Sequence, residues 1–165
     1  MIDIEELSGA GLVGRRLVGV TAAWHHDGDD EPSLLHLWLH LEGLGPVLFH
    51  TPSTGLSLRA EQPCAPYSMA PYGSVRVADD PPGVPVTGFV GQVVRSVREI
   101  GYDDGRVGFP AGLALGFPGG SVRLLALVDE LVVARDRHLG AVEAHLSEGP
   151  DLAAAGGVPC AGGRG

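Results

Sequence analysis

Histidine and tryptophan side chains recur at alternate positions of one apolar stretch, "SLLHLWLHLEGLGPVLFHT" (residues 33–51). The alternation sets Leu35, Leu37, Leu39 and Leu41 against His36, Trp38, His40 and Glu42. Strict alternation of this kind is typical of a β-strand with one face turned toward the core. We therefore expect a strand with an inward leucine face and an outward face that carries imidazoles and an indole.

The turn after this strand decides which of these side chains come together. With a turn at residues 43–45, antiparallel pairing places Trp38 opposite His50 and His40 opposite Leu48. We therefore expect His50 to join the same outward face.

Three imidazoles on one face could bind a transition metal, relay protons or line an aromatic ligand pocket. His36 and His40 lie four strand positions apart, about 13 Å along the strand, which disfavours one metal ion shared by both. Packing or plain surface is the favoured interpretation, and we predict no metal and no cofactor. His36, Trp38, His40 and His50 remain candidate binding residues.

A proline-rich stretch, "PCAPYSMAPYG" (residues 63–73), adds Tyr67 and Tyr72 as candidate binding residues. Its Cys64 and Ser68 lack the flanking pattern of a nucleophile elbow or a Cys-His pair. The sequence contains no lysine, which excludes Schiff-base chemistry and a Walker-type phosphate lysine. We predict no catalytic residues and favour a protein that is not an enzyme.

Two segments of the chain are similar to each other, which indicates an internal repeat. "GLVGRRLVGVTAAWHHDG" (residues 11–28) aligns without a gap on "GFVGQVVRSVREIGYDDG" (residues 88–105). Alternation and β-branched residues predict four strands in each copy. The predicted strands are residues 15–24, 34–42, 46–51 and 56–61, and then 92–100, 111–117, 121–127 and 130–135.

The predicted fold is mainly β, with two pseudo-symmetric four-stranded antiparallel halves that form a sandwich or a partly closed barrel. We expect one β domain over residues 1–149. Its parts are repeat 1 (11–61), a linker (62–87) with an edge strand at 74–78, repeat 2 (88–136) and a short C-terminal helix (137–147). Residues 150–165 are expected to form a disordered tail.

The charge and the apolar pattern of the sequence limit which classes of partner we expect. A formal charge of −9 over 165 residues repels nucleic acid, because affinity for phosphates depends on cationic contacts. No segment has the uninterrupted apolar length of a membrane span or a signal peptide. We therefore predict a cytoplasmic protein with no membrane and no nucleic acid as partner, for which a protein partner is favoured over a small molecule.

The segments "GQVVRSV" and "GLALGFPGGSVRLLALVDELVV" resemble small duplicated β domains of actinobacterial genomes, some of which are similar to immunity proteins of polymorphic toxin systems. The resemblance implies a bacterial non-catalytic binding protein of the immunity or inhibitor type, with an acidic and aromatic surface. It transfers no individual functional residue. The alternative is a small-molecule binder or enzyme whose pocket between the two halves is lined by His36, His40, His50 and Trp38.

Overall fold

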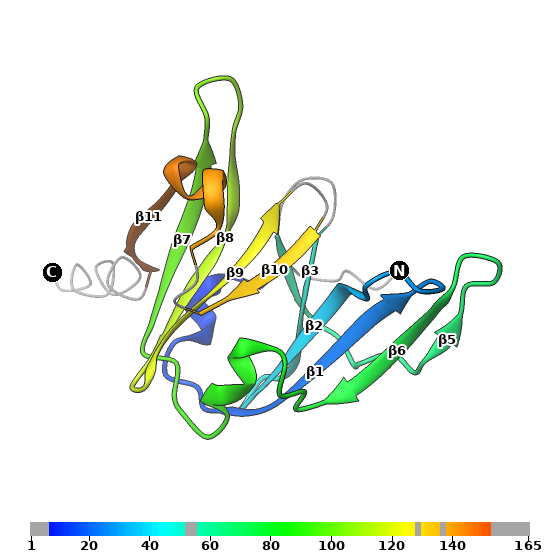
Figure 1. The fold of residues 1–165 in the computed structure, drawn as a ribbon. Coiled ribbons are helices and arrows are strands. Elements are labelled where there is room, and N and C mark those ends of the chain that lie inside the picture. The colour runs from blue at the N-terminus through cyan, green and yellow to red at the C-terminus, as the bar shows by residue number, and fades with distance from the viewer. Residues whose placement is uncertain (1–6, 52–55, 128–129, 136–137, 153–165) are drawn as a thin grey trace, which may run out of the picture.

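The computed structural model describes residues 7–51, 56–127, 130–135 and 138–152. These residues form two antiparallel sheets that face each other, as the prediction of a mainly β protein required (Figure 1). The first sheet contains β1 (Leu17–His26), β2 (Ser33–Leu41), β3 (Gly45–His50), β4 (Ser57–Ala60), β5 (Tyr67–Ser68) and β6 (Ser74–Asp79). The second contains β7 (Ser96–Asp103), β8 (Gly108–Phe117), β9 (Gly120–Leu127), β10 (Glu130–Ala134) and β11 (Leu146–Asp151).

The strand orders of the two sheets are β4-β3-β2-β1-β6-β5 and β10-β9-β8-β7-β11. Each sheet is therefore a four-stranded meander with further strands added beside its first strand. The sheets stay separate and do not close into a barrel in the described part of the chain. The shared strand order is compatible with the predicted repeat, while the duplication itself stays a prediction.

The main core lies between the sheets and takes apolar side chains from both. Leu37, Leu39 and Leu41 of β2 are fully buried in it together with Leu113 and Leu115 of β8. The 3-10 helices η1 (Gly9–Leu12) and η2 (Pro85–Phe89) close its margins with Leu12, Val86 and Phe89. The predicted inward face of the leucines is thereby confirmed for three of its four members.

The fourth leucine faces the other way because the pairing between β1 and β2 is irregular. A register shift between Ala23 and Trp24 makes Ala23 pair with His36 and Trp24 pair with Leu34. The extra residue reverses the alternation, as a β-bulge does. Leu34 therefore packs on the main core, and Leu35 packs on the opposite face of the sheet.

The linker prediction needs two corrections. The strand expected at 74–78 is present as β6, but it lies between β1 and β5 and so is not an edge. A second short strand, β5, pairs with it inside the segment that was expected to be a linker.

The short C-terminal helix predicted over 137–147 is also corrected. The chain instead forms a 3-10 helix, η3 (Gly140–His145), followed by β11 on the free side of β7. Gly140, the first residue of η3, has a φ of 69°, which an α-helix does not accommodate, so no α-helix runs through this position. Pro150 and Asp151 belong to β11, so the tail does not begin at 150, and its remainder from 153 lies outside the described residues.

Candidate functional site

The outward face of β2 is a closed apolar cluster and not an exposed surface. Trp38 is 1% exposed and packs with Ala23, Leu48 and Val75. This face is turned away from the second sheet, so Trp38 and its neighbours do not line a pocket between the two halves.

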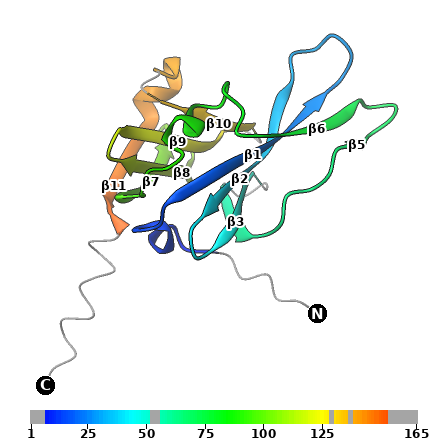
Figure 2. The ribbon, with the colours of Figure 1, turned by 90° about the horizontal axis from the view of Figure 1, so that it is seen from below.

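The connection from β4 to β5, residues 61–66, covers this cluster; we call it the first crossing segment. β4 lies at one edge of the sheet and β5 at the other, so the chain must cross a face to join them. The second sheet occupies the inner face, and Figure 2 shows the chain passing along the other side. Cys64, a free thiol, packs there against the Trp38 cluster.

The register of β2 with β3 differs from the predicted register by two residues. Trp38 pairs with Leu48, and His36 pairs with His50. A shift of two keeps His50 on the expected face, because side chains alternate with a period of two. The His36 ring lies 5.8 Å from the Trp38 ring and 6.1 Å from the His50 ring, edge-on to both.

The environment of His36 disfavours its charged form. Burial lowers its pKa below the ordinary value of 6.5, and the neighbouring His50 lowers it further, whereas Glu61 opposes the shift. Within the described residues, no three His, Cys, Asp or Glu side chains are grouped so as to hold a metal ion. The lowered pKa and the ring contacts of His36 favour a packing role for this imidazole over metal binding.

His40 is separated from the other two imidazoles and belongs to a hydrogen-bonded chain with Thr21 and Asp79. The Thr21 hydroxyl donates to Asp79 Oδ1 over 2.7 Å, and its oxygen lies 2.7 Å from His40 Nε2. Because the hydroxyl has one proton, the assigned arrangement requires His40 Nε2 to donate to it. Thr21 is 2% exposed, so this hydroxyl cannot reach a substrate as a nucleophile.

Tyr67 and Tyr72 lie on the β5–β6 hairpin, far along the first sheet from the second one (Figure 1). They are 46% and 70% exposed. The structure thus divides the six predicted binding residues into a covered cluster, a separate hydrogen-bonded chain and an exposed aromatic hairpin.

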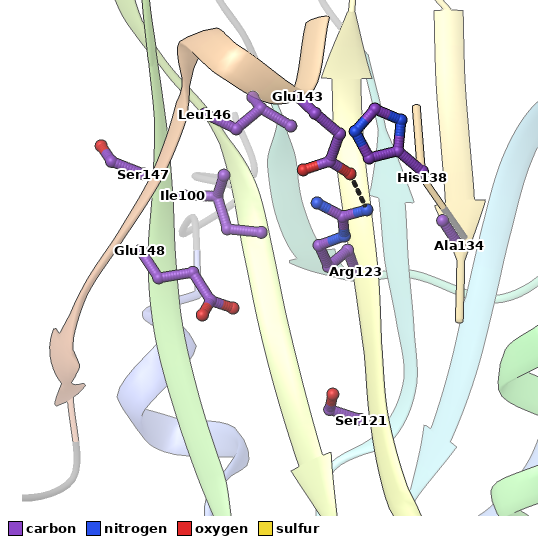
Figure 3. A pocket seen from close by; sticks show the side chains of 9 residues that line it. All are labelled: Ile100, Ser121, Arg123, Ala134, His138, Glu143, Leu146, Ser147 and Glu148. Atoms are coloured by element: carbon purple, nitrogen blue, oxygen red, sulfur yellow. Dashed lines mark hydrogen bonds and ion pairs between the residues drawn. The ribbon is translucent and has the colours of Figure 1, made fainter. Parts of the chain in front are cut away.

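A cavity of about 570 Å³ lies on the outer face of the second sheet. Residues 138–145, which we call the second crossing segment, lie over this face on the path from β10 to β11 (Figure 1). Arg123 of β9, Ile100 of β7 and Leu146 of β11 contribute from the sheet, while Glu143 contributes from the second crossing segment (Figure 3).

An ion pair holds the second crossing segment to the sheet. Arg123 and Glu143 point toward each other and form a hydrogen-bonded salt bridge, with side chains 20% and 23% exposed (Figure 3). The backbone N–H of Leu139 also donates to Glu143 Oε1 over 3.3 Å. The hydrogen bond from Arg123 is the main cause that lowers the pKa of Glu143 below 4.5, opposed by partial desolvation.

The remaining polar groups of the cavity are His138, Ser121, Ser147 and Glu148. His138 Nδ1 accepts a hydrogen bond from the Gly140 N–H over 3.2 Å, which leaves its ring proton on Nε2. Ser147 points away from the other labelled side chains in Figure 3. Glu148 comes from β11, on the opposite wall from Arg123.

Sequence reasoning did not find this cavity. Arg123 stands in a strand that alternates Ser121, Arg123 and Leu125 outward with Val122 and Leu124 inward. Glu143 lies in the segment that was expected to form a short C-terminal helix, where no site residue was predicted. The available signal was an arginine in the middle of an otherwise apolar strand, but its partner lies 20 residues away.

Two further cavities lie where the sheets meet. One, of about 540 Å³, is lined by Trp24, Leu34 and Leu131 among others, and one of about 250 Å³ by Leu58 and Leu113 among others. Neither is lined by His36, Trp38, His40 or His50. A pocket between the halves with the predicted lining is therefore not present among the described residues.

No protein family, curated protein or solved structure matches this chain. No helix in the described part is both long and apolar enough to cross a membrane. The cavity on the second sheet is thus the candidate site on geometry alone.

Proposed function

We propose that the protein is a non-catalytic binding protein and that the second-sheet cavity is its recognition site. The main observation in support is the Arg123–Glu143 ion pair, which holds the second crossing segment over a cavity of about 570 Å³ with polar lining residues. Binding sites are typically concave, with apolar walls and a few placed polar groups. Ile100 and Leu146 supply such walls, and Glu148 supplies a further charge.

The partner in this proposal is a protein, and the function is of the immunity or inhibitor type in the bacterial cytoplasm. The formal charge of −9 supports a basic partner, because complementary charge accelerates association and excludes acidic competitors. It also supports the exclusion of nucleic acid. The weak resemblance of the strand pattern to immunity proteins points in the same direction.

The contacts of the candidate groups support binding over catalysis. Arg123 and Glu143 neutralise each other, and the Thr21 hydroxyl is buried beneath its neighbours. A nucleophile must approach both a base and a substrate. Neither arrangement offers that geometry.

Blocking the cavity mouth tests the proposal. Ser121 is exposed on β9 beside Arg123, so Ser121→Trp places an indole at the entrance, while Ser68→Trp places one on the exposed hairpin next to Tyr67. Partner capture from the native host with wild-type, Ser121→Trp and Ser68→Trp proteins should recover the same protein with wild-type and Ser68→Trp only.

Loss of the partner with Ser68→Trp and its retention with Ser121→Trp would move the interface to the tyrosine hairpin and contradict the proposal. Absence of any partner with all three proteins would also contradict it. Circular dichroism and urea unfolding establish that both variants fold.

A further inference from the structure

The pairing of the central strands shows what occupies corresponding places on the two outer faces. Counted from the turn, the fourth pair of the β2–β3 hairpin is Trp38 with Leu48. The fourth pair of the β8–β9 hairpin is Ala114 with Arg123. A large apolar pair in the first sheet thus corresponds to a methyl group beside a guanidinium in the second.

The sixth pairs differ in the same way. His36 pairs with His50 in the first sheet, whereas Gly112 pairs with Leu125 in the second. A Cβ on Gly112 would lie 1.9 Å from the Leu124 carbonyl oxygen, so the backbone excludes any side chain there. Ala114 and Leu125 belong to a buried apolar cluster with Ile100, and the second-sheet cavity lies beside this cluster, lined by Ile100 and Arg123.

The charges that face this volume favour a cation. Its lining contains the carboxylates of Glu143 and Glu148 and one guanidinium, that of Arg123, which Glu143 already holds. An anion would have to displace Glu143 from Arg123 and leave a partly buried carboxylate without its partner. A cation can instead approach Glu148 and the outer side of Glu143 without breaking the existing pair.

A further guanidinium on this face of the sheet, that of Arg98, does not change this balance. Arg98 stands on β7 opposite Ala114, but its Nη1 donates to the Gly149 carbonyl over 3.3 Å. Asp151 pairs with Arg98 across β7 and β11, which adds another carboxylate to this side of the sheet.

We infer that the second-sheet cavity takes the guanidinium side chain of an arginine. An arginine side chain has a planar cation that suits two carboxylates and an aliphatic stem that packs on apolar walls. Glu148 and Glu143 receive the guanidinium, and Ile100, Leu146 and Ala134 contact the stem. This inference rests on the proposed function and names the group by which the partner is recognised.

The test is an NMR titration of the full chain with two short peptides, acetyl-Gly-Arg-Gly-amide and the same peptide with citrulline. Citrulline keeps the planar shape of arginine and removes its charge. We expect the arginine peptide to shift the backbone amides of Ser121, Arg123, Leu139 and Ser147. Its Kd should be at least about fivefold lower than that of the citrulline peptide, as expected for one charge-assisted contact.

Glu148→Gln should weaken the arginine peptide by a similar factor. Glu42→Gln is the matched control, because Glu42 is an exposed carboxylate on the first sheet, 3.9 Å from Arg16. It should leave the Kd unchanged.

Three results overturn the inference. These are equal binding of both peptides, binding that Glu148→Gln does not weaken, and cavity shifts caused by glutarate but not by the arginine peptide. A cavity that rejects the arginine peptide while Ser121→Trp still abolishes partner capture removes the guanidinium inference and leaves the proposed function standing. Partner capture that Ser121→Trp does not affect removes the proposed function itself.

Discussion

The outer faces of the two sheets are each crossed by a connection that returns the chain from one edge of a meander to the other. Beneath the first crossing segment lies Trp38, 1% exposed and packed among apolar neighbours. Beneath the second lie an ion pair and a cavity of about 570 Å³. Both crossing segments thus rest on apolar clusters, since Leu139 of the second packs against the cluster of Ile100 and Leu125, but the second face adds an ion pair and a cavity.

This difference bears on how much each face stabilises the fold. A buried aromatic side chain removes about 150–250 Å² from water, which makes its cluster one of the largest local sources of stability. A partly exposed ion pair contributes about 0–1 kcal/mol in typical cases, because water screens it and two side chains lose freedom. The first face therefore contributes mainly to stability, while the second retains an accessible cavity lined by charged side chains.

Removing the indole of Trp38 should destabilise the packing on the first face and cause the largest loss of stability among these variants. Trp38→Ala should lower the free energy of unfolding by about 3–5 kcal/mol, because it leaves a cavity beneath the first crossing segment. Urea unfolding monitored by far-UV circular dichroism measures the change. Tyr72→Ala is the control, since Tyr72 is 70% exposed and its loss should change stability by no more than about 0.5 kcal/mol. Equal losses of unfolding free energy in Trp38→Ala and Tyr72→Ala would contradict the assignment of Trp38 to a buried, stabilising cluster.

Removing the buried hydroxyl should have an intermediate effect. Thr21→Val keeps the shape of the side chain but leaves His40 and Asp79 without the hydroxyl between them. We expect a loss of about 1–2 kcal/mol in the free energy of unfolding. Thr21→Ser retains the hydroxyl and should lose less. A Thr21→Val protein as stable as the wild type would show that the two partners are satisfied by water.

The first face should make stability depend on pH near neutrality. Because the pKa of His36 is lowered in the folded protein, the unfolded chain binds more protons below its ordinary pKa of 6.5. Stability should therefore fall as the pH decreases through 6.5 and level off below the lowered pKa of His36 in the folded protein, and His36→Gln should reduce this dependence. Urea unfolding at a series of pH values measures both proteins. If the unfolding free energies of wild type and His36→Gln change with pH in parallel, His36 is not the cause of the pH dependence.

The second face should respond only in the acid range and by the smallest amount. The pKa of Glu143 is lowered in the folded protein, so its contribution is fully present above 4.5 and disappears as the pH falls through the folded value. The unfolding free energies of wild type and Glu143→Gln should therefore converge below that range. Added salt should also reduce their difference at neutral pH, since the pair is partly exposed. A difference that persists at low pH and high salt would contradict the assigned role of the pair.

Local pattern predicted much of the framework. Alternation in β2 correctly placed Leu37, Leu39 and Leu41 in the core, because burial between two sheets requires a period of two. It failed at Leu35, because the pairing of β2 with β1 skips Leu35, and this irregularity leaves no mark in the alternation of β2 itself. His50 was predicted opposite Trp38 and lies opposite His36 instead, because the turn between β2 and β3 sets the register and its length does not follow from the alternation.

The sequence by itself determined the strand-rich class, the separate apolar face of each central strand and the acidic charge, because these follow from residue type and local period. Only the tertiary structure decided that Trp38 is covered, that the His40 side chain is hydrogen-bonded to Thr21, and that Arg123 forms an ion pair with Glu143 beside a cavity. Those contacts depend on which face each crossing segment takes and where it lies. Such choices are made by the packing of the two sheets as a whole, since the inner faces are already filled and the connections must pass outside.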